Sequence, residues 1–316
     1  MSDTGSSQAA DRLFHVNGEL VPRSEATVSV RDRGFKYGDA AFETLRAYGG
    51  DVFGWDAHAD RLEDTCSLLE IDHGLSTAEL HERVLRTLAA NGFEDAYVRL
   101  SISRGVQPGK LTPQPEVDPT VVIIVEPLSR GGVDESRRLS SANQKSASPD
   151  DVDSGPVWDG PATLKTVETR RIPNTAVPAS AKTHNYLNGI LARLELRGTD
   201  ADEAVMLDSQ GAIAEGAASN VFAVDGDGLV TPALSGPVLP GVTRATVIEI
   251  AEEEGIPVRE TTMLPTALRE AEEAFCTNST WEVRPVGKVD GTTVGGGPVT
   301  ELLAHGYRER VEERFY

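Results

Sequence analysis

The sequence predicts an α+β protein with two domains. At 316 residues the chain is long enough for two hydrophobic cores. Short alternating or β-branched runs and amphipathic helical runs are mixed in both halves, as in α+β domains. Between residues 129 and 160 this periodicity gives way to Ser, Asp, Gly and Pro. We therefore expect a disordered tail over 1–12, a small domain over 13–128, an interdomain linker over 129–160 and a large domain over 161–316.

Four segments of the first half predict β-strands: FHVNGELVP, AAFETLRAYGGDVFGW, AYVRLSISRG and PTVVIIVEPL. The first segment holds Asn17-Gly18 between apolar flanks, the usual signal of a two-residue hairpin. The second is expected to turn at Gly49-Gly50. In the second half, TLKTVET alternates like a strand, and DEAVMLDSQGAIAEGAASNVFAVDGDG predicts three short strands with tight turns.

Helical periodicity is found in both halves. One helix is predicted over about 56–71, and the next begins with Ser76 and Glu79 in capping-box register and ends near Gly92. Further helices are predicted near 184–197, 242–254 and 297–313.

The composition is acidic, with a formal net charge of −20, which disfavours binding to nucleic acid phosphates. The polar opening MSDTGSSQAADR does not resemble a signal peptide, and no apolar run reaches the length of a membrane span. Cys66 and Cys276 lie outside any CxxC pattern, as expected in a reducing, cytoplasmic compartment. The histidines show no ligand spacing, so no metal site is predicted. Abundant acid with little lysine also indicates a halophilic protein, with an ordinary acidic surface as the alternative.

Lysine is scarce, and one lysine has a distinctive position. The lysines are Lys36, Lys110, Lys145, Lys165, Lys182 and Lys288. Only Lys182, in AKTHNYLNGI, leads directly into an apolar helical run. A Schiff-base lysine needs a partly buried, electrostatically tuned site. From spacing alone, a surface charge beside a helix remains the simpler interpretation, so other residues must decide.

Three features fit a planar, phosphorylated ligand. Glu215 lies among small residues in IAEGAASN, where a ring can approach closely and a carboxylate can hold a ring nitrogen protonated. Gly241, Val242 and Thr243 stand at a predicted helix N-terminus, whose free N–H groups and dipole favour a phosphate. Arg61, in HADRL, offers a bidentate phosphate contact. Each feature also has an ordinary interpretation. Glu215 could be a charged residue in a turn, the helix N-terminus could be one helix end among several, and Arg61 could be a solvated cation.

The ordered motifs YGDAAFETLR, HADRL, AYVR, AKTHNYL, AEGAASNVF, LPGVTR and CTNSTWEVRPV together resemble the class IV, or fold-type IV, pyridoxal-phosphate enzymes. That family contains branched-chain amino acid aminotransferases, D-amino acid aminotransferases and aminodeoxychorismate lyases. The resemblance runs from about Val16 to about Asp290. It implies a two-domain fold like that of D-amino acid aminotransferase, pyridoxal 5′-phosphate at the domain interface, and a homodimer.

The resemblance also implies roles for single residues. Lys182 matches the lysine that binds the cofactor and transfers the proton. Tyr186 matches the hydrogen-bond partner of the ring hydroxyl, and Glu215 matches the partner of the ring nitrogen. The cofactor's phosphate would be held by Arg61, Gly241, Val242, Thr243 and the hydroxyl of Ser279.

For the substrate, the resemblance points to Tyr37, Phe42, Arg46, Tyr97 and Arg99. It implies an aminotransferase that moves an amino group between a branched-chain or other hydrophobic L-amino acid and a 2-oxo acid such as 2-oxoglutarate. Alternatives stay open. The chain has Phe42-Glu43-Thr44-Leu45-Arg46 where branched-chain enzymes usually have Phe-Glu-Gly-Ile-Arg. The segments ISRG and CTNS also resemble aminodeoxychorismate lyases, and Arg104 offers a carboxylate trap for a D-amino acid aminotransferase. A non-catalytic protein that binds pyridoxal phosphate is the remote alternative.

Overall fold

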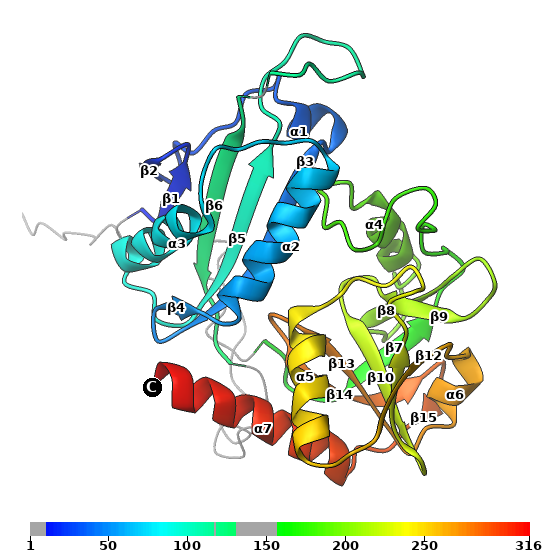
Figure 1. Cartoon of the computed structure of the whole chain (residues 1–316). Coiled ribbons are helices and arrows are strands. Elements are labelled where there is room, and N and C mark those ends of the chain that lie inside the picture. Colours follow the sequence, from blue (N-terminus) through cyan, green and yellow to red (C-terminus); the bar gives the residue numbers. More distant parts are fainter. Residues whose placement is uncertain (1–10, 117, 131–156) are drawn as a thin grey trace, which may run out of the picture.

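The computed structural model describes residues 11–116, 118–130 and 157–316. Within these ranges the chain forms two β-sheets, one from strands between residues 13 and 127 and one from strands between 162 and 293 (Figure 1). Helices accompany both sheets, so the α+β class is confirmed. Most of the predicted tail and of the predicted linker lies outside the described residues, and the division into domains at 129–160 stays a prediction.

The first sheet is antiparallel throughout, in the order β2-β1-β6-β5-β3-β4. Its strands are β1 (Leu13–Val16), β2 (Glu19–Pro22), β3 (Ala40–Tyr48), β4 (Asp51–Val52), β5 (Ala96–Ser103) and β6 (Thr120–Pro127). The predicted hairpin at Asn17-Gly18 is confirmed, because both residues have the positive φ, 50° and 96°, that such a turn requires. The turn at Gly49-Gly50 is confirmed in the same way, with φ of 54° and 84°.

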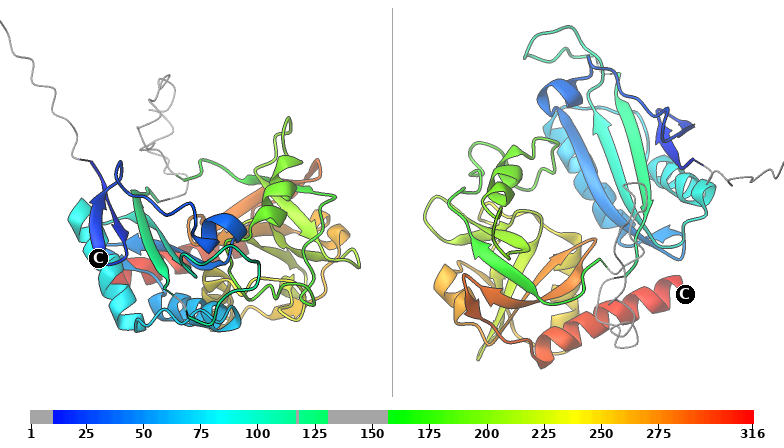
Figure 2. Two further views of the ribbon diagram at one scale, coloured as in Figure 1. Left: turned by 90° about the horizontal axis from the view of Figure 1, so that it is seen from above. Right: turned by 180° about the vertical axis from the view of Figure 1, so that it is seen from behind.

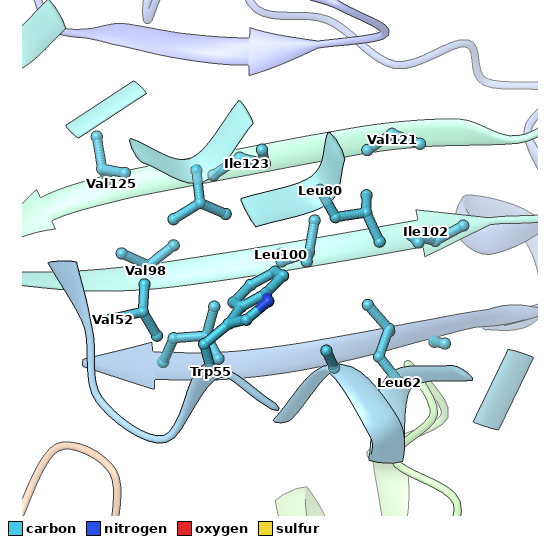
Figure 3. Close-up of a cluster of buried hydrophobic side chains, with 14 of the residues drawn as sticks. Val52, Trp55, Leu62, Leu80, Val98, Leu100, Ile102, Val121, Ile123 and Val125 are labelled. Atoms are coloured by element: carbon cyan, nitrogen blue, oxygen red, sulfur yellow. The ribbon is translucent and has the colours of Figure 1, made fainter. Parts of the chain in front are cut away.

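Two helices cover one face of this sheet: α2 (Trp55–Leu68) and α3 (Thr77–Asn91). Trp55 and Leu62 of α2 and Leu80 of α3 point at apolar side chains of β5 and β6, and together they form a buried core (Figure 3). The predicted capping box of α3 is present, with Ser76 and Glu79 bonded to each other's backbone N–H. The short helix α1 (Arg33–Tyr37) was not predicted; the Asp32 side chain caps it by accepting from Gly34 N.

The second sheet is mixed, in the order β12-β11-β10-β13-β14-β7-β8-β9, with β15 paired to β14. The strands are β7 (Ala162–Thr166), β8 (Glu203–Leu207), β9 (Ile213–Gly216), β10 (Asn220–Asp225), β11 (Gly228–Pro232), β12 (Val258–Thr261), β13 (Glu273–Asn278), β14 (Glu282–Val289) and β15 (Thr292–Thr293). The helices are α4 (Leu187–Leu194), α5 (Val242–Glu253), α6 (Pro265–Arg269) and α7 (Pro298–Phe315). The predicted helices near 184–197, 242–254 and 297–313 correspond to α4, α5 and α7.

Helix α7 joins the two sheets. It packs on β14 and α5, then continues toward the end of the first sheet where β3 and β4 meet (Figures 1 and 2). Tyr48 at the end of β3 belongs to the same buried cluster as Tyr307 of α7. No helix in the described ranges is both long enough and apolar enough to cross a membrane.

Candidate active site

A cavity of about 380 Å³ is lined by residues from both sheets. The first half of the chain contributes side chains from β3, β5 and α2. The second half contributes the β9–β10 connection, the start of α5 and the β13–β14 turn. Most of the predicted site residues line it: Phe42, Arg61, Tyr97, Arg99, Lys182, Tyr186, Glu215, Gly241, Val242, Thr243 and Ser279. Residues that are far apart in the sequence are thus brought to one place.

Lys182 precedes α4, but its backbone is held by helix α2 and strand β3. Its N–H donates to Thr65 Oγ1 on α2 at 3.1 Å, and its carbonyl accepts from Phe42 N on β3 at 3.0 Å. The side-chain Nζ lies 4.7 Å from the centroid of the Phe42 ring and 5.6 Å from that of Tyr186. The amine therefore lies beside two aromatic rings inside the cavity, a partly desolvated position that suits a nucleophilic lysine.

Glu215 lies on the buried strand β9 with both carboxylate oxygens bonded. Oε1 accepts from Arg171 Nε at 2.6 Å, and Oε2 accepts from the backbone N–H of Leu239 at 2.8 Å. Burial raises the pKa of Glu215, while the charges of Arg171 and Lys182 act in the opposite direction. The carboxylate therefore has a fixed orientation at the end of the wall formed by residues 216–218.

Arg61 is buried, so it is not the solvated helix charge that was the alternative. Its Nε and Nη2 donate to the two oxygens of Glu43 at 2.8 and 2.6 Å, and Nη1 donates to the Pro240 carbonyl at 2.6 Å. Burial works against the ionised form of Glu43, but Arg61 and His58 bring its pKa down to about 2. Because Glu43 occupies the edge that carries Nε and Nη2, that edge is not available to a phosphate in this arrangement. A phosphate contact would come from the remaining Nη hydrogens.

The start of α5 provides backbone donors beside Arg61. Gly241 is the N-cap residue, and no side chain caps the helix, so the first backbone N–H groups stay available to a ligand. A Cβ at Gly241 would lie 2.1 Å from Asn220 Oδ1, so only glycine fits there. Thr277 on β13 also lines the cavity, and its buried Oγ1 has no hydrogen-bond partner among the described residues. A bound polar group would satisfy that hydroxyl.

The opposite wall comes from paired strands β3 and β5. Thr44 is the one residue of β3 that is not buried, and it lies opposite Arg99 of β5 in the strand register. The Arg99 guanidinium carbon lies 3.9 Å from the centroid of the Phe42 ring. With Tyr97 two residues before Arg99, this wall combines a cation with aromatic surface.

Two predicted substrate residues do not line the cavity. Tyr37 lies on α1 with its ring beside Arg33 and Lys36. Arg46 is 1% exposed, and its guanidinium donates to the carbonyls of Thr280 at 3.0 Å and Leu128 at 3.2 Å. With these bonds Arg46 supports the β13–β14 turn, and direct substrate binding by Arg46 stays a prediction.

Some residues of the site were missed by the sequence analysis: Glu43, Thr44, Arg171 and Thr277. Glu43 follows Phe42 inside a buried strand, and a charged residue there was a signal of a buried ion pair. Arg171 stands beside Arg170 in an irregular segment, where no periodicity distinguishes a functional cation from a solvated one.

The residues of the cavity fit a phosphorylated pyridine cofactor. A cation and free helix N–H groups are available to a dianion, an oriented carboxylate is available to a ring nitrogen, and Lys182 lies in the same cavity beside two aromatic rings. The partnerless hydroxyl of Thr277 is a further point of contact.

Comparison with known proteins agrees with this geometry. Residues 40–289 match the family described as Amino-transferase class IV. A putative branched-chain-amino-acid aminotransferase of Methanocaldococcus jannaschii is 35% identical over 303 residues, which are 96% of this chain and 94% of that protein. A D-alanine aminotransferase of Staphylococcus haemolyticus is 30% identical (95% and 98% covered). An aminodeoxychorismate lyase of Bacillus subtilis is 32% identical (96% of each covered).

Solved structures show the same fold. The branched-chain aminotransferase of the archaeon Thermoproteus uzoniensis, determined with norvaline, superimposes with a TM-score of 0.83 at 30% identity, covering 96% of this chain and 97% of that one. A branched-chain amino acid aminotransferase of Thermobaculum terrenum in its pyridoxal-phosphate form has a TM-score of 0.79 at 26% identity, covering 97% and 96%.

Proposed function

The chain belongs to the class IV aminotransferase family, and from this premise we propose that it transfers the amino group of branched-chain or other hydrophobic L-amino acids to a 2-oxo acid such as 2-oxoglutarate. It is a pyridoxal-phosphate-dependent enzyme of fold type IV. The observation that carries the choice of substrate is the wall of Phe42, Tyr97 and Arg99, which places a cation against aromatic surface in one cavity.

The bound cofactor supplies the electron sink for negative charge at the substrate's α-carbon. We assign to Lys182 the covalent hold on the cofactor and the movement of the proton at that carbon. Tyr186, at the start of α4, would donate to the ring hydroxyl. Glu215 favours a protonated ring nitrogen by its charge. Arg61, the N–H groups at Val242 and Thr243, and the Ser279 hydroxyl would hold the phosphate.

The wall of β3 and β5 suits two different substrates in turn. An aliphatic side chain gains from contact with the rings of Phe42 and Tyr97. The γ-carboxylate of glutamate or 2-oxoglutarate gains a charge-assisted hydrogen bond from Arg99. Because both groups lie in the same cavity, one binding site can serve both half-reactions.

Single-turnover assays test this function. Each candidate donor (L-leucine, L-glutamate or D-alanine) is mixed with enzyme, and amine transfer is followed by the absorbance of the cofactor, with Lys182→Ala as the inactive control. We expect transfer from L-leucine and L-glutamate. Transfer from D-alanine alone would favour the activity named for the staphylococcal relative. Pyruvate release from aminodeoxychorismate without amine transfer would favour the lyase activity named for the Bacillus relative.

We also propose that the enzyme is a homodimer. Helix α4 exposes apolar side chains to solvent, between 39% and 60% of their surface: Leu187, Ile190, Leu191 and Leu194. An apolar helix face of this kind normally lies in an interface. Ile190 on this face also lines the active cavity, so a second copy of the chain seated there would close the site to solvent.

The proposed setting is a salt-loaded cytoplasm. The two cysteines are free and buried, as suits a reducing compartment. The net charge of −20 is the composition expected of a protein that must stay hydrated and soluble at high salt.

A further inference from the structure

Arg171 is a charged residue next to the site that has no role in the proposed function so far. It does not line the 380 Å³ cavity; it lines a second cavity of about 40 Å³ that shares Glu215 with the first. Its Nε donates to Glu215 Oε1 at 2.6 Å, and its side chain is only 20% exposed. Glu215 therefore faces the cofactor cavity while it is bound by a cation that stays outside that cavity.

The backbone around Arg171 is fixed from two sides. Its N–H donates to the carbonyl of Leu207 on β8 at 2.8 Å, and β8 is the strand that pairs with β9, which carries Glu215. The side-chain amide of Asn188 on α4 accepts from Ile172 N at 3.1 Å and donates to the Arg170 carbonyl at 2.9 Å. The backbone that carries the guanidinium is thus held in place by these bonds, as is usual for residues that orient a ligand-binding group.

We propose that Arg171 is a positioning residue that keeps Glu215 ionised and aimed at the cofactor. The proton shared between Glu215 and the ring nitrogen of the cofactor then resides on the nitrogen. This rests on the proposed function, because it takes the ring partner of Glu215 to be the pyridine nitrogen. It goes further because a residue outside the cavity, Arg171, would control the protonation state of that nitrogen.

The physical reason is a competition for one proton. A buried carboxylate without a nearby cation takes up a proton and becomes neutral. The charged groups that face Glu215 are Arg171 and Lys182, and both oppose that uptake. Coulomb energy falls with distance, so a cation 2.6 Å from the carboxylate stabilises its charge more than it repels a proton on the nitrogen beyond it. The proton therefore moves toward the ring.

Proton uptake on cofactor binding tests this without any turnover. Pyridoxamine 5′-phosphate is titrated into cofactor-free enzyme at neutral to mildly alkaline pH by calorimetry in buffers of different ionisation enthalpy; this ligand forms no covalent bond with Lys182. The parent protein, with Glu215 ionised, has no proton to give up, so the proton on the ring nitrogen arrives with the ligand or from solution. In Arg171→Gln, part of Glu215 already carries that proton, so we expect fewer protons taken up per cofactor bound.

Three further variants separate charge from packing. Arg170→Gln removes a neighbouring, solvent-exposed charge and should bind with the parent's proton uptake. Arg171→Lys keeps a cation and should fall between the parent and Arg171→Gln. In a Glu215→Gln background, Arg171→Gln should have no additional effect, because its target is gone. If Arg171→Gln alone does not fold, Arg171→Lys compared with the parent, in the presence of Glu215 and in the Glu215→Gln background, gives the same test.

The first half-reaction provides a second readout. In Arg171→Gln a smaller fraction of the cofactor has a protonated ring nitrogen, so removal of the α-proton of the substrate becomes harder. We expect this variant to slow the half-reaction by about ten-fold and to show a larger isotope effect with an α-deuterated substrate. Equal proton uptake in parent and Arg171→Gln, with an unchanged isotope effect, would show that Arg171 is only structural. If the parent itself transfers no amine, the proposed function fails, but the proton-uptake result still stands.

Discussion

Glu43 is the residue that holds Arg61 in place, since it binds two of the three guanidinium nitrogens. We expect Glu43→Gln to leave Arg61 poorly oriented and to lower cofactor retention by about ten-fold, the effect of losing a charged hydrogen bond. Dialysis of loaded enzyme with measurement of the retained cofactor checks this. Glu63→Gln, on the helix that carries Arg61 but in a separate, partly exposed pair with His73, is the matched control. Equal retention in Glu43→Gln and the parent would contradict the assignment.

The same carboxylate makes the protein sensitive to acid. The pKa of Glu43 is lowered from 4.5 to about 2 in the folded state. Its contribution to the free energy of unfolding is therefore present above pH 4.5 and is lost as the pH falls toward 2. By linkage that contribution is roughly 3 kcal/mol. Stability measured by denaturant unfolding should therefore fall less steeply below pH 4.5 in Glu43→Gln than in the parent.

Arg99 decides between the two substrates of the proposed reaction. Arg99→Leu should damage the half-reaction with glutamate or 2-oxoglutarate by about 1.5–3 kcal/mol, because only the acidic substrate loses a charge-assisted hydrogen bond. The half-reaction with leucine is the internal control and should change little. Cofactor absorbance in single-turnover mixing measures both rates. Equal losses for the two substrates would mean that Arg99 is needed only to hold the Phe42 ring.

At the scale of single elements, the hairpin of β1 and β2 depends on a neutral histidine. His15 is fully buried, and its Nε2 accepts from Gly18 N at 3.0 Å, so Nδ1 carries the proton. Burial, with the charges of Arg83 and Arg86, lowers the pKa of His15 from 6.5 to about 4. The neutral form is favoured in the folded state, so this contribution is complete above pH 6.5 and is lost between pH 6.5 and about 4.

We therefore expect His15→Gln, whose side-chain oxygen can still accept from Gly18 N, to lose less stability than the parent between pH 6.5 and 4. Denaturant unfolding at several pH values measures the difference. His305→Gln, at an exposed histidine of α7, should follow the parent curve. His58 and His184 also have lowered pKa values, so the slope should become smaller and not vanish. An unchanged slope in His15→Gln would contradict the role of the neutral imidazole.

Helix α4 is the element on which the proposed dimer depends. Leu191→Glu places a charge on its exposed apolar face and should shift the protein toward a monomer, seen by light scattering after size exclusion. Leu302→Glu, at an exposed leucine of α7, is the control and should leave the oligomeric state unchanged. A parent protein that is monomeric at micromolar concentration would remove the proposal.

At the scale of the whole molecule, a net charge of −20 makes the folded state repel itself. Added salt screens this repulsion, so the melting temperature should rise as KCl is increased into the molar range. Thermal scans at a series of KCl concentrations test this. A melting temperature that stays level or falls would favour the ordinary acidic surface over salt adaptation.

The two sheets are in contact through the buried cluster around α7. The Tyr48 hydroxyl on β3 donates to Glu282 Oε1 on β14 at 2.8 Å, and the Tyr48 ring packs at 5.8 Å from that of Phe315. These contacts join the two sheets that together line the cavity.

The sequence by itself determined the local elements and the residues whose chemistry has a local signal. Asn17-Gly18, the capping box at Ser76 and the apolar helix after Lys182 depend on neighbours in the chain, so they could be recognised there. Motif order supplied the family, and with it Lys182, Glu215 and the start of α5.

Only the tertiary structure decided how the charged side chains are partnered. Arg46 turns to the carbonyls of Leu128 and Thr280, Arg61 gives its bidentate edge to Glu43, and Arg171 reaches Glu215. Each of these contacts joins residues on different elements, several of them far apart in the chain. A guanidinium binds whichever oxygen packing places beside it, because burial makes an unpaired charge costly. Which oxygen lies there depends on how the helices and strands pack, so no local sequence pattern predicts the partner.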